Sequence, residues 1–197
     1  TEVPPPPTPE PPPPAIPDPP ASAPVTSELP PEHDVPLPPP AQTIDAQLTA
    51  IGDSVLLGAV SDLLRVFGSV DVDAAVGRQP GGAVPILSER SAAGNLSDIV
   101  LVHLGNNGTF TARDFDAIMT VLADRKLVVV VNNKIPRAWE ESNNAMLAGM
   151  IGNYANAVLV DWYGIAQGHP EFFYEDGVHL RPAGARVYAD LIAQYVR

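Results

Sequence analysis

The stretch from Leu48 to Phe67, LTAIGDSVLLGAVSDLLRVF, decides the fold of this chain. Leu48 to Ile51 is a short apolar run of the length expected for a buried β-strand, and Gly52-Asp53-Ser54 follows it as a turn. From Val55 to Phe67 the apolar residues recur at the spacing of one helix face. A strand that turns directly into a helix favours an α/β architecture.

The sequence after residue 41 repeats this alternation of strand and helix. Val70 to Val76 alternates apolar and polar residues and predicts a second strand. Ile99 to Leu104 and Leu127 to Val131 are continuous apolar runs, which are typical of parallel strands covered by helices on both faces. A further strand is predicted at Ala157 to Val160. The pattern therefore predicts a doubly wound sheet of about five parallel strands.

Two further helices are predicted from their starting signals. Thr111-Ala112-Arg113-Asp114 is a capping-box start to a helix that runs to about Ala123. Pro182 suits a first helical position and begins a closing helix that runs to about Val196. In such folds the working site lies beyond the carboxyl ends of the strands. Ser54, Gly77 and Asn107 each follow a predicted strand, so we expect all three at that edge.

The first 42 residues have a different composition from the rest. Of the 24 prolines, 19 lie within residues 1–40, where a packed core cannot form because donors and apolar bulk are missing. We expect residues 1–42 to be a disordered, semi-rigid linker and residues 43–197 to be one catalytic domain. A ligand for proline-binding modules is the alternative role for the linker. We also expect the chain to be a piece of a longer protein, since such an arm at a terminus usually leads to another domain.

Charge and composition exclude several function classes. The net charge is −12, with no Lys or Arg in the proline segment, so nucleic-acid binding is not expected. The chain has no cysteine, and its four histidines form no pattern typical of a metal site, so neither a metal nor another cofactor is predicted. No apolar run reaches the roughly 18 residues that a membrane span needs.

Ser54, His179 and Asp176 are the candidate catalytic residues. A serine at a strand-to-helix turn is placed to act as a nucleophile, although Asp53 or Ser54 could simply cap the helix. In Asp176-Gly177-Val178-His179, the carboxylate can fold back to the imidazole and fix its tautomer, which a general base requires. A surface turn that holds one acid and one histidine by chance is the alternative.

An oxyanion hole is predicted from three donors. These are the backbone N–H of Ser54, the backbone N–H of Gly77 and the side-chain amide of Asn107. Asn107 lies in the polar loop Gly105-Asn106-Asn107-Gly108, which could equally be an ordinary Asn-Gly turn. His103, inside an apolar run, is expected to be a hydrogen-bonded core residue.

These motifs, taken in order, resemble the SGNH (or GDSL) hydrolase superfamily. Its four sequence blocks are matched by Gly52-Asp53-Ser54, Gly77, Gly105-Asn106-Asn107 and Asp176-Gly177-Val178-His179. The resemblance implies the three-layer, flavodoxin-like α/β/α fold. It also implies Ser54 as nucleophile, His179 as base, Asp176 as the residue that orients it, and the oxyanion hole given above.

The third block narrows the resemblance. Many members carry Asp after the asparagine, whereas this chain has Gly108. Together with Val76-Gly77-Arg78-Gln79 and the segment Ile135 to Glu140, this version is similar to the extracellular domains of peptidoglycan O-acetyltransferases. There a membrane acyltransferase module, absent from this chain, precedes the domain through a flexible linker. Asn106, Arg137 and Trp139 are candidate substrate contacts, Trp139 through stacking on a sugar ring or else as a packing residue.

The leading hypothesis is an extracytoplasmic serine-dependent O-acetyltransferase. An acetyl-serine intermediate would pass its acetyl group to a cell-wall glycan hydroxyl, which the resemblance implies is the 6-hydroxyl of muramic acid. The implied donor is delivered by the membrane module, which also tethers the domain outside the membrane, and the domain is expected to be monomeric. An O-acetyl esterase, a wall-binding module without activity and a proline-rich adaptor are the alternatives.

Overall fold

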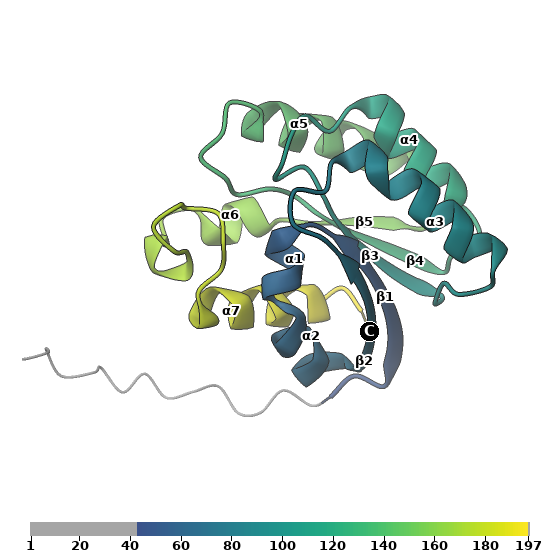
Figure 1. Ribbon diagram of the computed structural model, residues 1–197, viewed down its shortest axis with the longest axis horizontal. Coiled ribbons are helices and arrows are strands. Elements are labelled where there is room, and N and C mark those ends of the chain that lie inside the picture. Colours follow the sequence, from purple (N-terminus) through teal and green to yellow (C-terminus); the bar gives the residue numbers. More distant parts are fainter. Residues whose placement is uncertain (1–42, 197) are drawn as a thin grey trace, which may run out of the picture. The chain divides into compact units, whose positions relative to one another are not determined.

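A five-stranded parallel sheet forms the centre of the computed structural model, which describes residues 43–196. The strand order is β2-β1-β3-β4-β5, and helices cover both faces of the sheet (Figure 1). The strands are β1 (Ala46–Gly52), β2 (Gly68–Ala74), β3 (Ile99–His103), β4 (Leu127–Val131) and β5 (Ala157–Val160). This architecture confirms the predicted three-layer α/β fold. The predicted proline-rich linker lies outside the described residues.

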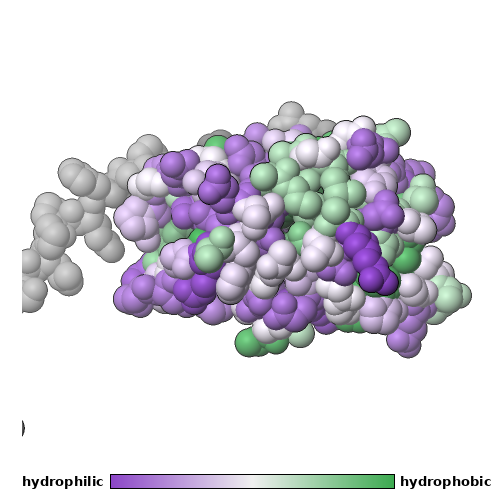
Figure 2. All heavy atoms as spheres, turned by 90° about the horizontal axis from the view of Figure 1, so that it is seen from above, coloured by the Kyte–Doolittle hydropathy of each residue, from purple (hydrophilic) through white to green (hydrophobic). Residues whose placement is uncertain are grey.

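Helices connect the successive strands. They are α1 (Ser54–Gly58), α2 (Val60–Phe67), α3 (Ala83–Ala92), α4 (Ala112–Val121), α5 (Glu140–Met150), α6 (Trp162–Ala166) and α7 (Pro182–Ala193). Short 3₁₀ turns add η1 (Pro80–Gly82), η2 (Ile151–Asn153) and η3 (Pro170–Phe172). Helices α3, α4 and α5 lie together above the sheet, and α1, α2 and α7 lie below it (Figure 1). Seen from above, the molecule shows mostly hydrophilic residues interrupted by weakly apolar areas (Figure 2).

The sheet separates two apolar cores. On the central strands successive side chains point to opposite faces. Leu101 and Val129 pack in the core between the sheet and helices α1, α2 and α7, whereas Val100 and Val128 pack in the core between the sheet and helices α3, α4 and α5. All four of these side chains are fully buried. This two-sided burial explains why the central strands are continuous apolar runs rather than alternating ones.

The register of the strands brings the candidate site residues to one edge. Gly52 at the end of β1 pairs with Ala74 at the end of β2 and with His103 at the end of β3. Three strands therefore stop at the same level. The loops that carry Ser54, Gly77 and Asn107 all begin from this edge.

Several expected boundaries differ from the observed ones. The helix expected from Val55 to Phe67 is two helices separated by a turn at Ala59, next to Gly58, a residue of low helix propensity. The strand expected at Val70 to Val76 begins and ends two residues earlier, and the closing helix ends at Ala193. Helices α3 and α5 had not been predicted.

Candidate active site

Ser54 lies where β1 turns into α1. A side chain at Gly52 would place its Cβ atom 2.9 Å from the carbonyl oxygen of His103, so glycine is required where the chain passes this close to β3. Asp53 is the N-cap of α1, and its carboxylate accepts a hydrogen bond of 3.1 Å from the backbone N–H of Val55. The cap role therefore belongs to Asp53, and the Ser54 hydroxyl is left available for other contacts.

His179 and Asp176 form a hydrogen-bonded chain that ends at Ser54. The imidazole Nε2 of His179 lies 3.0 Å from Ser54 Oγ, and its Nδ1 lies 2.6 Å from Asp176 Oδ2. The turn is held by Asp176 Oδ1, which accepts from the backbone N–H groups of Val178 (2.9 Å) and His179 (3.0 Å), and by Gly177, which has a φ of 67°. The three residues predicted from two distant motifs thus lie within hydrogen-bonding distance of one another.

The protonation state of Asp176 follows from these contacts. Burial acts to raise the pKa of Asp176, but hydrogen bonds from the His179 ring and from two backbone N–H groups outweigh it and lower the pKa to about 2. The carboxylate is therefore ionised at neutral pH and accepts a hydrogen bond from Nδ1–H. That leaves Nε2 free to accept the proton of the Ser54 hydroxyl.

Gly77 and Asn107 lie in the loops that follow β2 and β3. Gly77 is exposed, in a turn where its φ is 74°. The amide nitrogen of Asn107 is buried and has no hydrogen-bond partner among the described residues. A buried donor without a partner is costly, so this amide nitrogen is a candidate to donate to a bound group.

Asn106 is buried and makes its hydrogen bonds to the protein. It is 6% exposed, its amide nitrogen donates to both carboxylate oxygens of Asp53 (3.1 and 3.0 Å), and its amide oxygen accepts from Asn133 (3.1 Å). Contact of Asn106 with substrate stays a prediction. The residue ties the loop after β3 to the N-cap beside the nucleophile.

A buried histidine continues this network. His103 lies 3.3 Å from the Asn106 amide through Nε2 and 2.8 Å from the Tyr188 hydroxyl through Nδ1. Burial lowers the pKa of His103 to about 4, although the charge of Asp53 acts to raise it. The ring is therefore neutral at pH 7. His103 is a hydrogen-bonded core residue, as predicted.

Arg137 and Trp139 lie on the loop that leads into α5. A Cβ atom on Gly177 would lie 3.3 Å from Pro136, so this loop passes directly beside the turn that carries Asp176 and His179. Arg137 is exposed, whereas Trp139 is half-buried and its indole N–H donates to the carbonyl of Gly105 at 3.0 Å. The indole nitrogen is thus engaged with the protein. Contact of either residue with substrate stays a prediction.

Sequence reasoning missed the side chains that hold these loops together. Asn143, fully buried in α5, donates to the carbonyls of Gly105 (3.1 Å) and Gly108 (3.0 Å). Gln79 donates to the carbonyl of Asn107 at 2.6 Å. A signal for Asn143 existed, because an asparagine pair inside a helix is unfavourable unless it makes specific hydrogen bonds.

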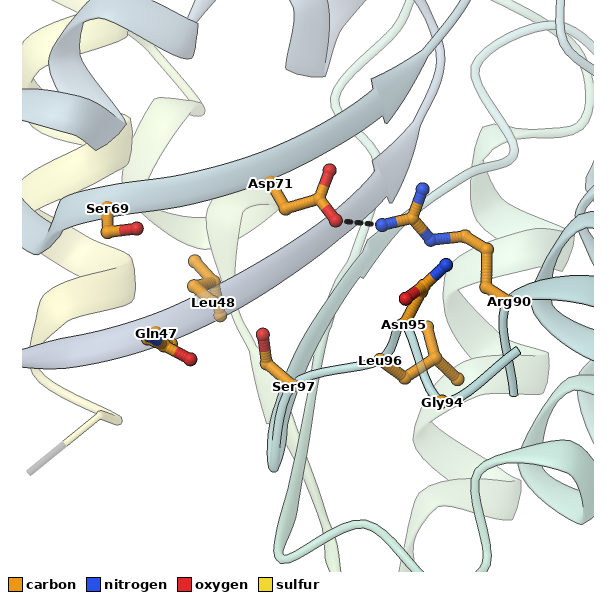
Figure 3. Close-up of a pocket in the computed structure, with 9 residues that line it drawn as sticks. All are labelled: Gln47, Leu48, Ser69, Asp71, Arg90, Gly94, Asn95, Leu96 and Ser97. Atoms are coloured by element: carbon orange, nitrogen blue, oxygen red, sulfur yellow. Dashed lines mark hydrogen bonds and ion pairs between the residues drawn. The ribbon is translucent and has the colours of Figure 1, made fainter. Parts of the chain in front are cut away.

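A separate hollow of about 410 Å³ lies near the opposite edge of the sheet, where β1 and β2 begin (Figure 3). Its charged lining residues, Asp71 and Arg90, are paired with each other. Within residues 43–196, no group of three or more His, Asp or Glu side chains could hold a metal ion. In the same range, no helix combines the length and hydropathy that crossing a membrane requires.

Comparison with other proteins gives several matches, although no protein-family model matches the chain. The chain is 32% identical over 151 residues to the peptidoglycan O-acetyltransferase OatA of Listeria monocytogenes, covering 77% of this chain and 24% of that protein. It is 32% identical over 145 residues to the O-acetyltransferase OatA of Staphylococcus aureus, covering 73% and 24%. The chain thus spans about a quarter of the length of these relatives.

Solved structures share the fold. The C-terminal catalytic domain of the peptidoglycan O-acetyltransferase OatA from Streptococcus pneumoniae, solved with a methylsulfonyl adduct, superposes with a TM-score of 0.69 at 25% identity, covering 77% of this chain and 92% of that one. A family 3 carbohydrate esterase from Clostridium thermocellum superposes with a TM-score of 0.62 at 17% identity, covering 77% and 98%. The second match shows a common fold alone.

Proposed function

The chain belongs to the family of the peptidoglycan O-acetyltransferases that it matches over about three quarters of its length, and from that premise we propose that residues 43–197 are the catalytic domain of a serine-dependent O-acetyltransferase that acts on peptidoglycan. The observation that carries the proposal is the hydrogen-bonded chain from Asp176 through His179 to Ser54. The match to peptidoglycan O-acetyltransferases over three quarters of the chain supports the substrate class.

The proposed reaction has two half-steps with His179 as the base in both. His179 Nε2 takes the proton of Ser54 as Oγ attacks the carbonyl carbon of an acetyl donor, and the donor's leaving group departs with that proton. A glycan hydroxyl then attacks the acetyl-serine, gives its proton to His179, and displaces Ser54 Oγ, which is reprotonated. Asp176 keeps the imidazole in the tautomer that both steps need. The acceptor that we propose is the 6-hydroxyl of muramic acid.

The negative charge of each tetrahedral intermediate needs donors. We propose the backbone N–H groups of Ser54 and Gly77 and the side-chain amide of Asn107 for this role. The buried, unpartnered amide nitrogen of Asn107 supports its part in the set. Such donors act where charge develops, so their loss lowers kcat more than it changes KM.

The length of the relatives supports a role for this domain as one part of a longer protein. Because the chain spans about a quarter of them, we propose that a membrane acyltransferase module delivers the acetyl group, with residues 1–42 as the linker. The domain would then work outside the membrane, tethered to it and close to the cell wall.

An O-acetyl esterase is the second candidate. The side chains of His179 and Asp176 are 48% and 43% exposed, so water can approach the base that would activate an acceptor. If water competes with the sugar hydroxyl, the same intermediate yields free acetate.

The decisive experiment offers the protein muramic-acid-containing glycan oligomers together with 4-nitrophenyl acetate. Acetylated glycan, detected by mass spectrometry, is the expected product, and the Ser54→Ala variant should form neither that product nor an acetyl-enzyme adduct. Free acetate as the sole product would favour the esterase. Turnover that survives in Ser54→Ala would overturn the assignment of the nucleophile.

A further inference from the structure

Gln79 connects two loops that carry proposed oxyanion donors. It lies two residues after Gly77, and its side-chain amide nitrogen donates to the backbone carbonyl of Asn107 at 2.6 Å. The two residues are 28 positions apart in the sequence, and this contact crosses from the loop after β2 to the loop after β3. The contact therefore joins a residue two positions after one proposed donor, Gly77, to the backbone of the other, Asn107.

Gly108 leaves the space that the Gln79 carboxamide occupies. A Cβ atom on Gly108 would come well under 3.0 Å from Gln79 Oε1, closer than real side-chain contacts. The φ of Gly108 lies outside the left-handed region that favours glycine, since Gly108 is not among the positive-φ glycines. The close approach of Gln79, rather than the backbone conformation, is therefore what this glycine permits.

Each loop also has an anchor of its own, and among residues 43–196 the Gln79 contact is the side-chain hydrogen bond that joins the two loops. Arg78 forms an ion pair of 2.5 Å with Asp73 on β2, which holds the loop of Gly77 to its own strand. Asn143 holds both ends of the other loop through the carbonyls of Gly105 and Gly108. Neither anchor sets the position of one loop relative to the other.

We propose that Gln79 is a positioning residue, which fixes the spacing between the Gly77 N–H and the Asn107 amide, and that Gly108 is present to admit its side chain. The inference rests on the proposed function, because it assigns both donors to one oxyanion hole. It also gives a physical reason for the Gly-Arg-Gln and Asn-Gly pattern: the glutamine and the second glycine are a matched pair. Donors misplaced by about 1 Å can cost about 100-fold in rate.

The first test compares Gln79→Ala and Gln79→Glu with the wild-type protein on 4-nitrophenyl acetate. We expect kcat to fall about 10- to 100-fold in both variants, with KM and Tm unchanged, because Gln79 is exposed and contributes little to folding. Gln79→Glu keeps the shape and loses the donor. The control Gln194→Ala, an exposed glutamine at the end of α7, should keep wild-type kinetics.

Double variants separate positioning from a merely structural role. In an Asn107→Ala background, Gln79→Ala should change kcat by about twofold or less, because the donor that it positions is already gone. Gly108→Ala should lower kcat as Gln79→Ala does, and the two together should be no worse than either alone. Gly149→Ala, at a site with no neighbour within 4 Å, is the glycine control.

The outcomes distinguish this inference from the proposed function. Two results would overturn the inference about Gln79 and leave the proposed function standing. One is an unchanged kcat in Gln79→Ala when the wild-type protein is active. The other is an effect of Gln79→Ala that is as large in the Asn107→Ala background as in the wild-type protein. Acetate without acetylated glycan would overturn the transferase and leave the Gln79 effect measurable. If the protein does not turn over the acetyl ester, the rate of Ser54 labelling by methanesulfonyl fluoride can be compared among the same variants. This labelling reaction needs the same oxyanion donors.

Discussion

Acid should destabilise this protein through His103 before it protonates the carboxylates of the surface. Burial lowers the pKa of His103 from 6.5 in the unfolded chain to about 4 in the folded one. Between these values the unfolded chain binds a proton that the folded protein does not, so stability is complete above about pH 6.5 and falls as pH decreases towards 4. One pKa unit corresponds to about 1.4 kcal/mol, so the loss from this group is about 3 kcal/mol.

The hydrogen bonds of the ring give the physical reason. The amide nitrogen of Asn106 is a donor and lies 3.3 Å from His103 Nε2, so Nε2 must accept and the proton belongs on Nδ1, next to the Tyr188 hydroxyl. Protonation would place a second N–H opposite the Asn106 amide in a site closed to water. The repulsion adds to the cost of burying the charge.

Urea denaturation between about pH 7 and pH 4.5 measures this effect. The unfolding free energy of the wild-type protein should fall more steeply with acid than that of His103→Gln, and the difference between the two should approach about 3 kcal/mol. His169→Gln, which removes an exposed ring, should keep most of the wild-type dependence. Parallel pH profiles for the wild-type protein and His103→Gln would refute the reasoning.

Three further changes test other parts of the structure. Asn107→Ala should lower kcat on an acetyl ester about 10²- to 10³-fold without changing Tm; a normal kcat would exclude its amide from the oxyanion hole. Asp176→Asn should lower kcat by about 10⁴-fold. Folding lowers the pKa of Asp176 from 3.8 to about 2, so the ionised carboxylate should stabilise the protein above pH 3.8, and this contribution should be lost as pH falls towards 2. The difference in Tm between the wild-type protein and Asp176→Asn, followed over this pH range, measures the loss. Gly184→Ala should lower the unfolding free energy by about 1–3 kcal/mol, since its Cβ atom would collide with the carbonyl of Phe172, whereas Gly149→Ala should not.

The sequence predicts the strands best where a short apolar run has a polar residue on each side. The bounds of β4 and β5 are those predicted from Leu127 to Val131 and from Ala157 to Val160, because each is a short apolar run between polar neighbours. Helices α3 and α5 were missed because their apolar residues do not gather on one face. In α5, Glu140 to Asn144 is entirely polar, and its buried side is an asparagine.

Some residues of the candidate site could be predicted from sequence motifs and others could not. Ser54, Asp176 and His179 could be placed by motif, since each carries its role in its own chemistry and lies at a turn with a clear signal. Asn143 and Gln79 could not, because they act through carbonyls 35 and 28 residues away, and such contacts exist only once the loops have met. The burial of Asn106 could not be predicted either, because its hydrogen bonds to the Asp53 carboxylate form only once the two loops have met.

The loop after β3 also bears on how long the protein keeps its activity. Asn107-Gly108 is a sequence prone to deamidation, in which the glycine nitrogen attacks the asparagine side chain and leaves an aspartate or isoaspartate. At this position ageing would exchange an amide donor for a negative charge that repels an oxyanion. Asn143 holds the Gly108 carbonyl and Gln79 holds the Asn107 carbonyl, and this restrains the rotation that the attack requires. We therefore expect the contacts that order the loop also to slow its deamidation, and Gln79→Ala to deamidate faster at Asn107 than the wild-type protein in aged samples analysed by peptide mass spectrometry.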